Sequence, residues 1–181
     1  MQILAGVGSA PSGDFDSIAT TTVGFGGAAT ITFSSIPATF KHLQLRCLAR
    51  TNRADTDDQL RIQINSDTAS NYSMHALSGD GASTSTNGLA SQTYMFLGRP
   101  TAALASASIF GVTVIDIVDY ANTSKYKTFR GSTGIDFNGS GFSSFLSGAW
   151  LNTAAITSVQ VTFIGSLMSE YSQFALYGIK G

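Results

Sequence analysis

The chain has 181 residues, 12% of them charged, and 10 Lys and Arg against 11 Asp and Glu give a formal net charge of -1. This length supports one domain with a sizeable core, and the balanced charge argues against electrostatic capture of nucleic acid or an anionic membrane. Nearly half of the residues are Ser, Thr, Gly or Ala, and the only Glu is Glu170. Because helices avoid Ser, Thr and Gly inside and carry Glu on their surfaces, a mainly helical protein is excluded.

Cysteine and histidine are too scarce for a disulfide framework or a zinc site. Cys47 is the single cysteine, and His42 and His75 are the only histidines. We therefore expect no metal and no cofactor. The first ten residues lack the basic flank and apolar run of a signal peptide, and the most apolar stretch, 109–118, is short and contains Asp116, so no membrane segment is expected.

Residues 1–16 are predicted to form an N-terminal arm, because Gly, Ser and Pro interrupt any regular pattern there. The apolar side chains that could anchor this arm on another copy or another protein are Ile3, Leu4, Val7 and Phe15. The alternative is a first edge strand of the protein's own sheet. Residues 17–181 are predicted to be one domain, since they contain no repeat of fixed period and no break in composition.

Alternation of apolar and polar residues is clearest at 42–50 and 59–64, which we interpret as a hairpin closed by 51–58. Its inner face is aliphatic and its outer face carries arginines. The predicted inner face of the domain consists of Leu43, Leu45, Cys47, Leu60, Ile62, Ile64, Val159, Val161 and Phe163.

The remaining strands are predicted at 17–23, 29–33, 73–77, 94–97, 109–118, 126–131, 142–150, 158–164 and 173–179. Gly and Asn mark turns at 24–27, 78–82, 87–88 and 138–141. About 8–11 short strands with no long helical pattern predict an all-β protein, an antiparallel, jelly-roll-like β-sandwich. Segments 109–118 and 174–179 are apolar on both faces, which indicates central strands or an interface. Segments 78–93 and 98–108, rich in small residues, are interpreted as wrapping a neighbouring molecule.

The sequence offers little catalytic chemistry, and we do not predict an enzyme. Asp116 and Asp119 are the closest carboxyl pair on a strand, but a spacing of three places them on opposite faces. Cys47 falls on the aliphatic face of its strand, where an inert buried thiol is expected. Trp150 ends an apolar strand and is assigned to the core, with a stacking platform for a sugar as the alternative.

Arginines and aspartates cluster in and beside the segment that joins the first two strong strand patterns. Asp55, Asp57 and Asp58 lack the spacing of a calcium-binding EF-hand, and pairing with Arg50 or Arg53 explains them better. Since these acids cancel the arginine charge, the arginines indicate a polar sheet face or the rim of a protein contact. Besides the four arm residues, the candidate partner contacts are Arg46, Arg50, Arg53, Tyr94 and Arg99.

Two segments carry a resemblance to known proteins. They are SIPATFKHLQLRCLARTNRADTDDQLRIQINSDTASNY at 35–72 and SGAWLNTAAITSVQVTFIGSLMSEYSQFALYGIKG at 147–181. Over roughly residues 30–181 the chain resembles predicted virion proteins of tailed bacteriophages, especially those of aquatic and cyanobacterial hosts. The shared features are packing and turn patterns, so they carry over no functional residues. The resemblance implies a place in the particle, with capsid decoration, collar and tail fibre all open.

From this resemblance we expect a non-enzymatic virion structural protein, located on the outer capsid surface or the tail and assembled in the host cytoplasm. Cement proteins of tailed phages are commonly compact jelly rolls that bind between capsomers. The expected partners are further copies in a symmetric dimer or trimer and the major capsid protein, or another virion protein. The alternative is a tail-fibre or collar component that binds a host-surface polysaccharide through 78–88 and 138–141.

Overall fold

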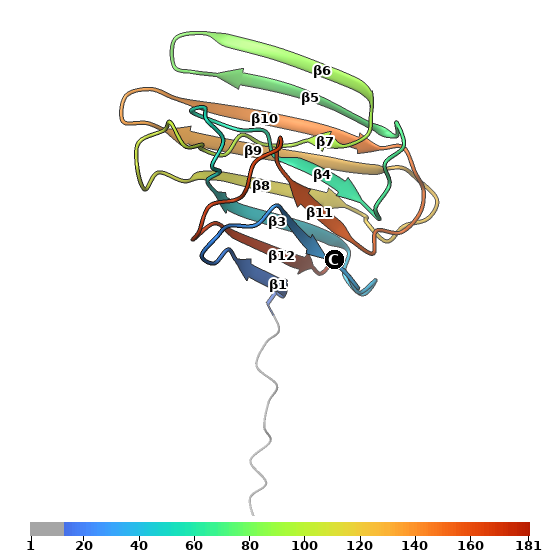
Figure 1. Cartoon of the computed structure of the whole chain (residues 1–181). Helices are drawn as coiled ribbons and strands as arrows, with labels where there is room; N and C mark the ends of the chain where they lie inside the picture. Colours follow the sequence, from blue (N-terminus) through green and yellow to red (C-terminus); the bar gives the residue numbers. More distant parts are fainter. Residues whose placement is uncertain (1–12) are drawn as a thin grey trace, which may run out of the picture.

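The computed structural model describes residues 13–181, and over this range every regular element is a β-strand (Figure 1). Two antiparallel sheets face each other. In spatial order, the eight-stranded sheet contains β1 (Phe15–Thr22), β12 (Gln173–Ile179), β3 (His42–Ala49), β8 (Gly111–Val118), β9 (Lys127–Asp136), β10 (Gly141–Trp150), β5 (Tyr72–Gly79) and β6 (Thr84–Gln92). The four-stranded sheet contains β2 (Thr30–Phe33), β11 (Val159–Thr162), β4 (Arg61–Ile64) and β7 (Met95–Phe96).

Strand pairing defines the fold as a jelly roll with two added hairpins. If β5–β6 and β9–β10 are set aside, β1 pairs with β12, β2 with β11, β3 with β8 and β4 with β7. The pairs β12–β3 and β11–β4 then join the two halves within each sheet. This nested pairing of eight strands in two sheets is the jelly-roll arrangement, so the predicted fold class is confirmed.

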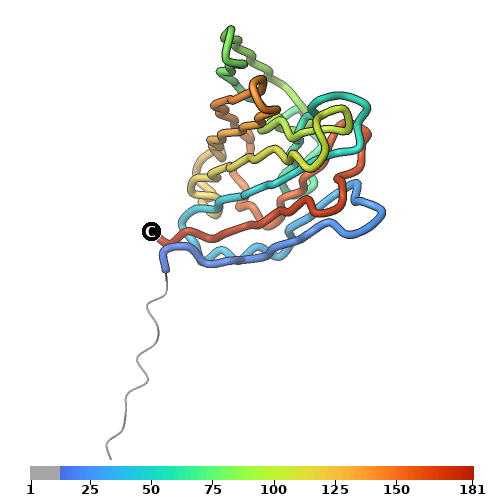
Figure 2. The backbone as a smooth tube through the Cα atoms, turned by 90° about the vertical axis from the view of Figure 1, so that its left-hand side faces the viewer, coloured from blue at the N-terminus to red at the C-terminus, as the bar shows by residue number. Residues whose placement is uncertain are grey.

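The two added hairpins both extend the same sheet. They continue it beyond β8 in the order β9, β10, β5 and β6. In Figures 1 and 2 the green β5–β6 hairpin lies at the end of the molecule opposite the blue strand β1. The larger sheet therefore reaches well past the sheet that covers it.

The predicted inner face is the core of the sandwich. All nine side chains named for it are buried, with Cys47 at 2% and Phe163 at 5% exposure. Alternation along β3 buries Leu43, Leu45 and Cys47 and leaves the intervening side chains at the surface. Trp150 is also in the core at 1% exposure, and its indole N–H donates to Asp67 at 2.7 Å.

The predicted hairpin between 42–50 and 59–64 is wrong. Strand β3 pairs with β12 and β8, whereas β4 belongs to the opposite sheet and pairs with β11 and β7. The two strands face each other across the core. Alternation with a period of two identifies which side of each strand is buried. The same alternation occurs whether two strands pair within one sheet or face each other in opposite sheets, so it cannot identify the partner of a strand.

Segment 78–93, interpreted as wrapping a neighbouring molecule, contains strand β6 at the edge of the larger sheet. Asn87 and Gly88, predicted as a turn, lie within this strand. The chain reverses instead after Asp80, whose carboxylate accepts the backbone N–H groups of Ala82 at 2.9 Å and Ser83 at 2.7 Å. Most side chains of β6 are exposed on both of its faces, so no alternation marks the strand.

The predicted arm, residues 1–16, overlaps strand β1, which begins at Phe15. Phe15 pairs with Ile179 and Asp16 with Gly178, so these two residues belong to the sheet, as in the edge-strand alternative. The other arm contacts, Ile3, Leu4 and Val7, lie outside the described residues. The prediction of central strands at 109–118 and 174–179 agrees with β8, which lies between β3 and β9, and β12, which lies between β1 and β3.

Two leucines of β3 test the assignment of its faces. Leu45 is fully buried, whereas Leu48 is 45% exposed on the opposite face. We expect Leu45→Ala to lower the free energy of unfolding by about 2–5 kcal/mol, because it removes buried methyl groups and leaves a cavity. Leu48→Ala should change it by about 0.5 kcal/mol or less. Urea denaturation of both variants measures the difference, and equal effects would contradict the assignment.

Candidate binding surfaces

Arg50, one of the predicted partner contacts, is directed into the protein. Its guanidinium donates to the backbone carbonyls of Ala103 at 3.3 Å, Ala105 at 2.8 Å, Ser106 at 2.9 Å and Ile109 at 3.0 Å. These bonds hold the segment before β8 against the end of β3. The main role of Arg50 in this structure is thus to satisfy the carbonyl groups of a loop.

Arg53 belongs to a second local network, centred on the fully buried Asp58. The Asp58 carboxylate accepts Thr51 Oγ1 at 3.0 Å and the backbone N–H of Gln59 at 2.7 Å, and it also accepts the Ser166 hydroxyl. Arg53 lies 3.3 Å from Asp58 and 3.4 Å from Asp55. The predicted local pairing is therefore confirmed for Asp55 and Asp58 with Arg53, whereas Asp57 pairs with Arg99 and Arg50 pairs with none of these acids.

The remaining predicted contacts lie at separate places. The Arg46 guanidinium carbon is 4.9 Å from the ring centre of Tyr177 and 5.8 Å from that of Phe15, so Arg46 and Phe15 are brought together. Tyr94 instead stacks under Arg61, at 4.1 Å. Arg99 forms a two-point ion pair with Asp57, at 2.9 and 2.8 Å. The six predicted contacts that lie within the described residues do not form one continuous site.

The outer face of the eight-stranded sheet carries an apolar row that the sequence did not reveal. Val114, Ser132, Phe145 and Leu77 are direct neighbours across β8, β9, β10 and β5. Phe145 is 73% exposed and Leu77 is 54% exposed. Shallow hollows of about 530, 430 and 430 Å³ adjoin Phe145. We call this surface, Val114 to Leu77 with its hollows, the outer apolar face.

Charge on the outer apolar face is balanced locally. Arg130 donates to Asp116 at 2.8 Å, and Gln44 donates to the same carboxylate at 2.8 Å. Burial raises the pKa of Asp116, but the hydrogen bonds from Gln44 and Arg130 outweigh this effect, so the pKa is lowered overall. Asp116 is thus an ionised partner of Arg130 at neutral pH.

The inner face of the same sheet forms a cleft where the four-stranded sheet ends. The cleft has a volume of about 230 Å³ and lies between the inner face of β5, β6, β9 and β10 on one side and the segment from Phe96 to Arg99 with Gln59 on the other. A methyl group on Gly148 would come within 2.2 Å of the Met95 sulfur, so β7 packs closely on β10 only because residue 148 is glycine. Beyond this contact the inner face of the larger sheet is no longer covered by the four-stranded sheet. We call this space the overhang cleft.

A row of hydroxyl side chains runs along the inner face into the overhang cleft. Direct cross-strand pairing aligns Thr113, Thr133, Ser144, Ser78 and Ser85 on five consecutive strands, β8, β9, β10, β5 and β6. Gly98 lies against Thr113 at the covered end of the row. The last four side chains line the cleft.

Hydrogen bonding differs between the two ends of this row. Thr113 and Thr133 are bonded at 2.9 Å, and Thr133 also bonds the Val112 carbonyl at 3.1 Å, so both threonine protons have acceptors. Ser78 and Ser144 are bonded only to each other, at 2.8 Å. Since one bond uses one proton, the second serine proton has no acceptor among the described residues.

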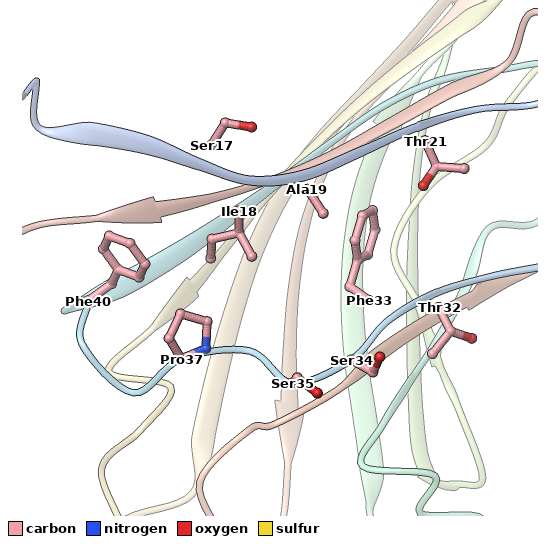
Figure 3. Close-up of a pocket in the computed structure, with 10 residues that line it drawn as sticks. All are labelled: Ser17, Ile18, Ala19, Thr21, Thr32, Phe33, Ser34, Ser35, Pro37 and Phe40. Carbon is pink, nitrogen blue, oxygen red and sulfur yellow. The ribbon is translucent and has the colours of Figure 1, made fainter.

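A second hollow lies at the other open side of the sandwich, between β1 and β2 (Figure 3). Its volume is about 520 Å³. Ile18 and Ala19 point from β1 toward the segment after β2, and Phe33 points back toward β1 (Figure 3). This hollow is lined by apolar and hydroxyl side chains without an amide or a charged group.

The candidate reactive residues are engaged in structural contacts. Asp119 pairs with Lys125 and, at 3.1 Å, with Lys41. These contacts lower its pKa to about 2. Cys47 is buried, and burial raises the pKa of its thiol, as expected for an inert side chain.

Lys127 was not singled out from the sequence, although it is fully buried. Its ammonium donates to the carbonyls of Asn122, Lys125 at 3.0 Å and Thr153 at 2.9 Å. Burial lowers the pKa of Lys127, and the charge of Lys125 adds to this effect. By donating to three carbonyls, Lys127 links the loop that contains Asn122 and Lys125 to the loop that contains Thr153.

Within residues 13–181, no group of three or more His, Cys, Asp or Glu side chains is placed to share a metal ion. The same range contains no helix that could cross a membrane. Comparisons with protein-family models, with curated proteins and with solved structures find no match to this chain.

The Arg50 network makes a testable prediction for loop stability. Arg50→Lys keeps the charge but loses the planar group that reaches four carbonyls. We expect backbone amides in 102–110 to exchange hydrogen roughly tenfold faster, because bonds to charged donors contribute about 1.5–3 kcal/mol. Hydrogen exchange followed by mass spectrometry measures this, with Arg46→Lys as the matched control. Unchanged exchange in Arg50→Lys would show that the loop does not depend on these bonds.

Proposed function

We propose that this protein is a non-enzymatic structural component of a tailed-phage virion, a capsid decoration or cement protein. It associates with further copies of itself and stabilises contacts between capsomers of the major capsid protein. The resemblance of residues 30–181 to virion proteins supports this function, as does the jelly-roll fold. Because one fold can host many unrelated functions, the main support comes from a surface of the protein.

That surface is the outer apolar face, and its exposed apolar side chains are the single observation that carries the proposal. Phe145 and Leu77 are neighbours across β10 and β5, and Leu48 and Val112, at 45% and 49% exposure, form a second exposed pair on β3 and β8. Clustered apolar residues on a sheet face mark protein contacts more often than isolated ones. Asp116 and Arg130 neutralise each other as an ion pair, and Arg46, the neighbour of Val114 on β3, is the cation beside this face that has no acidic partner among the described residues.

The occupant that best fits the outer apolar face is a second copy of the chain. Phe145 and the hollows that adjoin it lie on one surface. A two-fold axis beside Phe145 would therefore place each ring in a hollow of the other copy, which is the self-complementarity that symmetric dimers require.

Replacing Phe145 tests this contact. We expect the wild-type protein to be an oligomer and Phe145→Ser to shift the equilibrium toward monomer by a factor of about 10–100, because burying one aromatic side chain contributes about 1.5–3 kcal/mol. Size-exclusion chromatography with light scattering measures the mass at several concentrations. Phe25→Ser is the matched control, since Phe25 is 95% exposed in the turn after β1. A monomeric wild-type protein would refute self-association through this face.

Truncation tests the proposed contact of the arm with the capsid. Because Phe15 and Asp16 belong to β1, only residues 1–12 should be removed. We expect the melting temperature to stay within about 2 °C while binding to particles stripped of this protein is lost, since Ile3, Leu4 and Val7 would contribute about 1.5–3 kcal/mol each on burial. Removal of residues 1–22, which includes β1, should lower the melting temperature. If the shorter truncation still saturates the particles, the contact lies elsewhere, with Tyr94 and Arg99 as the next candidates.

Counting copies on purified particles distinguishes the virion positions. Hundreds of copies per particle would agree with capsid decoration. A small number at one vertex would instead indicate a collar or fibre component, and absence from the particle would refute a virion role. Quantitative mass spectrometry against the major capsid protein gives this ratio directly.

A further inference from the structure

The overhang cleft exists only because of strands that the jelly roll does not need. Eight strands complete the two covered sheets, and β9, β10, β5 and β6 are added to one of them. Near β7 the added inner face is apolar and covered, with Trp150, Tyr72 and Met74 buried. Farther along the same strands it changes to Ser144, Ser78 and Ser85. The polar end of this added surface lies where the covering sheet stops.

The chemistry of the cleft is polar but uncharged. The amides of Gln59 and Asn87 and the hydroxyl of Ser85 form no side-chain hydrogen bond with the described residues, although all three line the cleft. The unused proton of the Ser78–Ser144 pair adds a donor at the floor, where the two side chains are 9% and 5% exposed. Only the Ser78–Ser144 pair is buried, and a buried polar group with an unused proton indicates a water or a ligand. Gln59, Ser85 and Asn87 are open to solvent, so their polar groups are free to bond a ligand in the cleft.

The charge that borders the cleft is already neutralised. Arg99 is bonded at two points to Asp57, and its guanidinium carbon lies 4.3 Å from the ring centre of Phe142. Phe96 and Leu146 supply further apolar surface on the cleft wall. An anionic ligand would therefore have to compete with Asp57 for the arginine, whereas a neutral ligand would not.

We propose that the overhang cleft binds one ring of a neutral saccharide. Sugar hydroxyls donate and accept at once, which matches side chains that can do both, and the apolar faces of a sugar ring suit the phenylalanine-lined wall. The volume of about 230 Å³ is somewhat below that of sites for drug-sized ligands, about 300–1,000 Å³, and fits a single ring. A glycan chain could continue out of the open end.

This inference is independent of the proposed virion function. The cleft is on the inner face of the larger sheet, whereas Phe145 and Leu77 are on its outer face. Phe145→Ser should therefore leave sugar binding unchanged. Residues 78–88 and 138–141, which the sequence suggested as polysaccharide-binding loops, overlap the cleft only in part, through β5 and β6.

Titration of the isotope-labelled protein with sugars, followed by amide resonances in NMR spectra, tests the proposal. The probes are glucose, galactose, mannose, rhamnose and N-acetylglucosamine, with glucuronate as the charged comparison. We expect at least one neutral sugar to shift the amide resonances of Ser78, Ser85 and Asn87 with a Kd on the order of 1 mM, as is usual for a ligand of about twelve heavy atoms. Glucuronate should bind more weakly than that sugar.

The double variant Ser85→Ala/Asn87→Ala supplies the decisive comparison. Both side chains are exposed and form no side-chain bond within the described residues, so the variant should fold normally. We expect its Kd to rise roughly 4- to 100-fold, since each of the two lost hydrogen bonds weakens binding about 2- to 10-fold. Thr86→Ala is the matched control, because Thr86 lies between them on the opposite face of β6.

The inference would be overturned by the absence of any shift with all five neutral sugars at about 50 mM, far above the expected Kd. Shifts confined to residues outside the cleft, or equal affinity of wild type and the double variant, would overturn it as well. Tighter binding of glucuronate than of every neutral sugar would also contradict it, because it would mean that Arg99 is free to pair with a ligand.

Discussion

The unequal width of the two sheets governs this structure. A two-layer sandwich can bury only as much of its larger sheet as the smaller sheet covers, and here eight strands face four. Where the two sheets overlap, the core between them contains Leu45 of the larger sheet and Ile62 and Val161 of the smaller sheet, all fully excluded from solvent. Beyond the overlap, the strands of the larger sheet must present side chains that tolerate water. The change from Trp150 to Ser144 along β10 is the direct result.

The same constraint explains why the two faces of the overhang differ. Its inner face is recessed behind β7 and carries paired hydroxyls, whose bonds to one another reduce the cost of partial burial. Its outer face is a flat surface on which Phe145 projects. A recess of this width suits a small ligand, and a flat apolar surface suits another protein. The four added strands, which extend one sheet, thus present two different surfaces without altering the jelly roll.

The core and the fold class could be predicted from the sequence because both depend on the alternation of side chains along single strands. Leu43, Leu45 and Cys47 in β3, and Ile62 and Ile64 in β4, are correctly identified in this way. The partner of each strand could not be predicted. Alternation shows which side is buried but not whether the next buried side lies beside it or across the core, which is why β3 and β4 were joined in a hairpin.

The candidate sites were harder to predict, for two physical reasons. Strand β6 has solvent on both sides, so Ser85 and Asn87 follow no pattern that distinguishes them from loop residues. The cleft also collects Gln59, Asn87 and Arg99 from distant parts of the chain, and only the register of the strands brings them together. Arg50 was misleading for the opposite reason, since a charged side chain suggests the surface while its bonds are to loop carbonyls.

The position of the two added hairpins within the chain affects how this protein can change over generations. Each hairpin is inserted between strands of the jelly roll, and its polar side chains in the cleft contribute little to the buried core. Substitutions at Ser85 or Asn87 can therefore change the polar lining of the cleft at almost no cost in folding stability. The lining of the cleft and the stability of the core thus depend on separate residues, so the first can vary while the second is conserved.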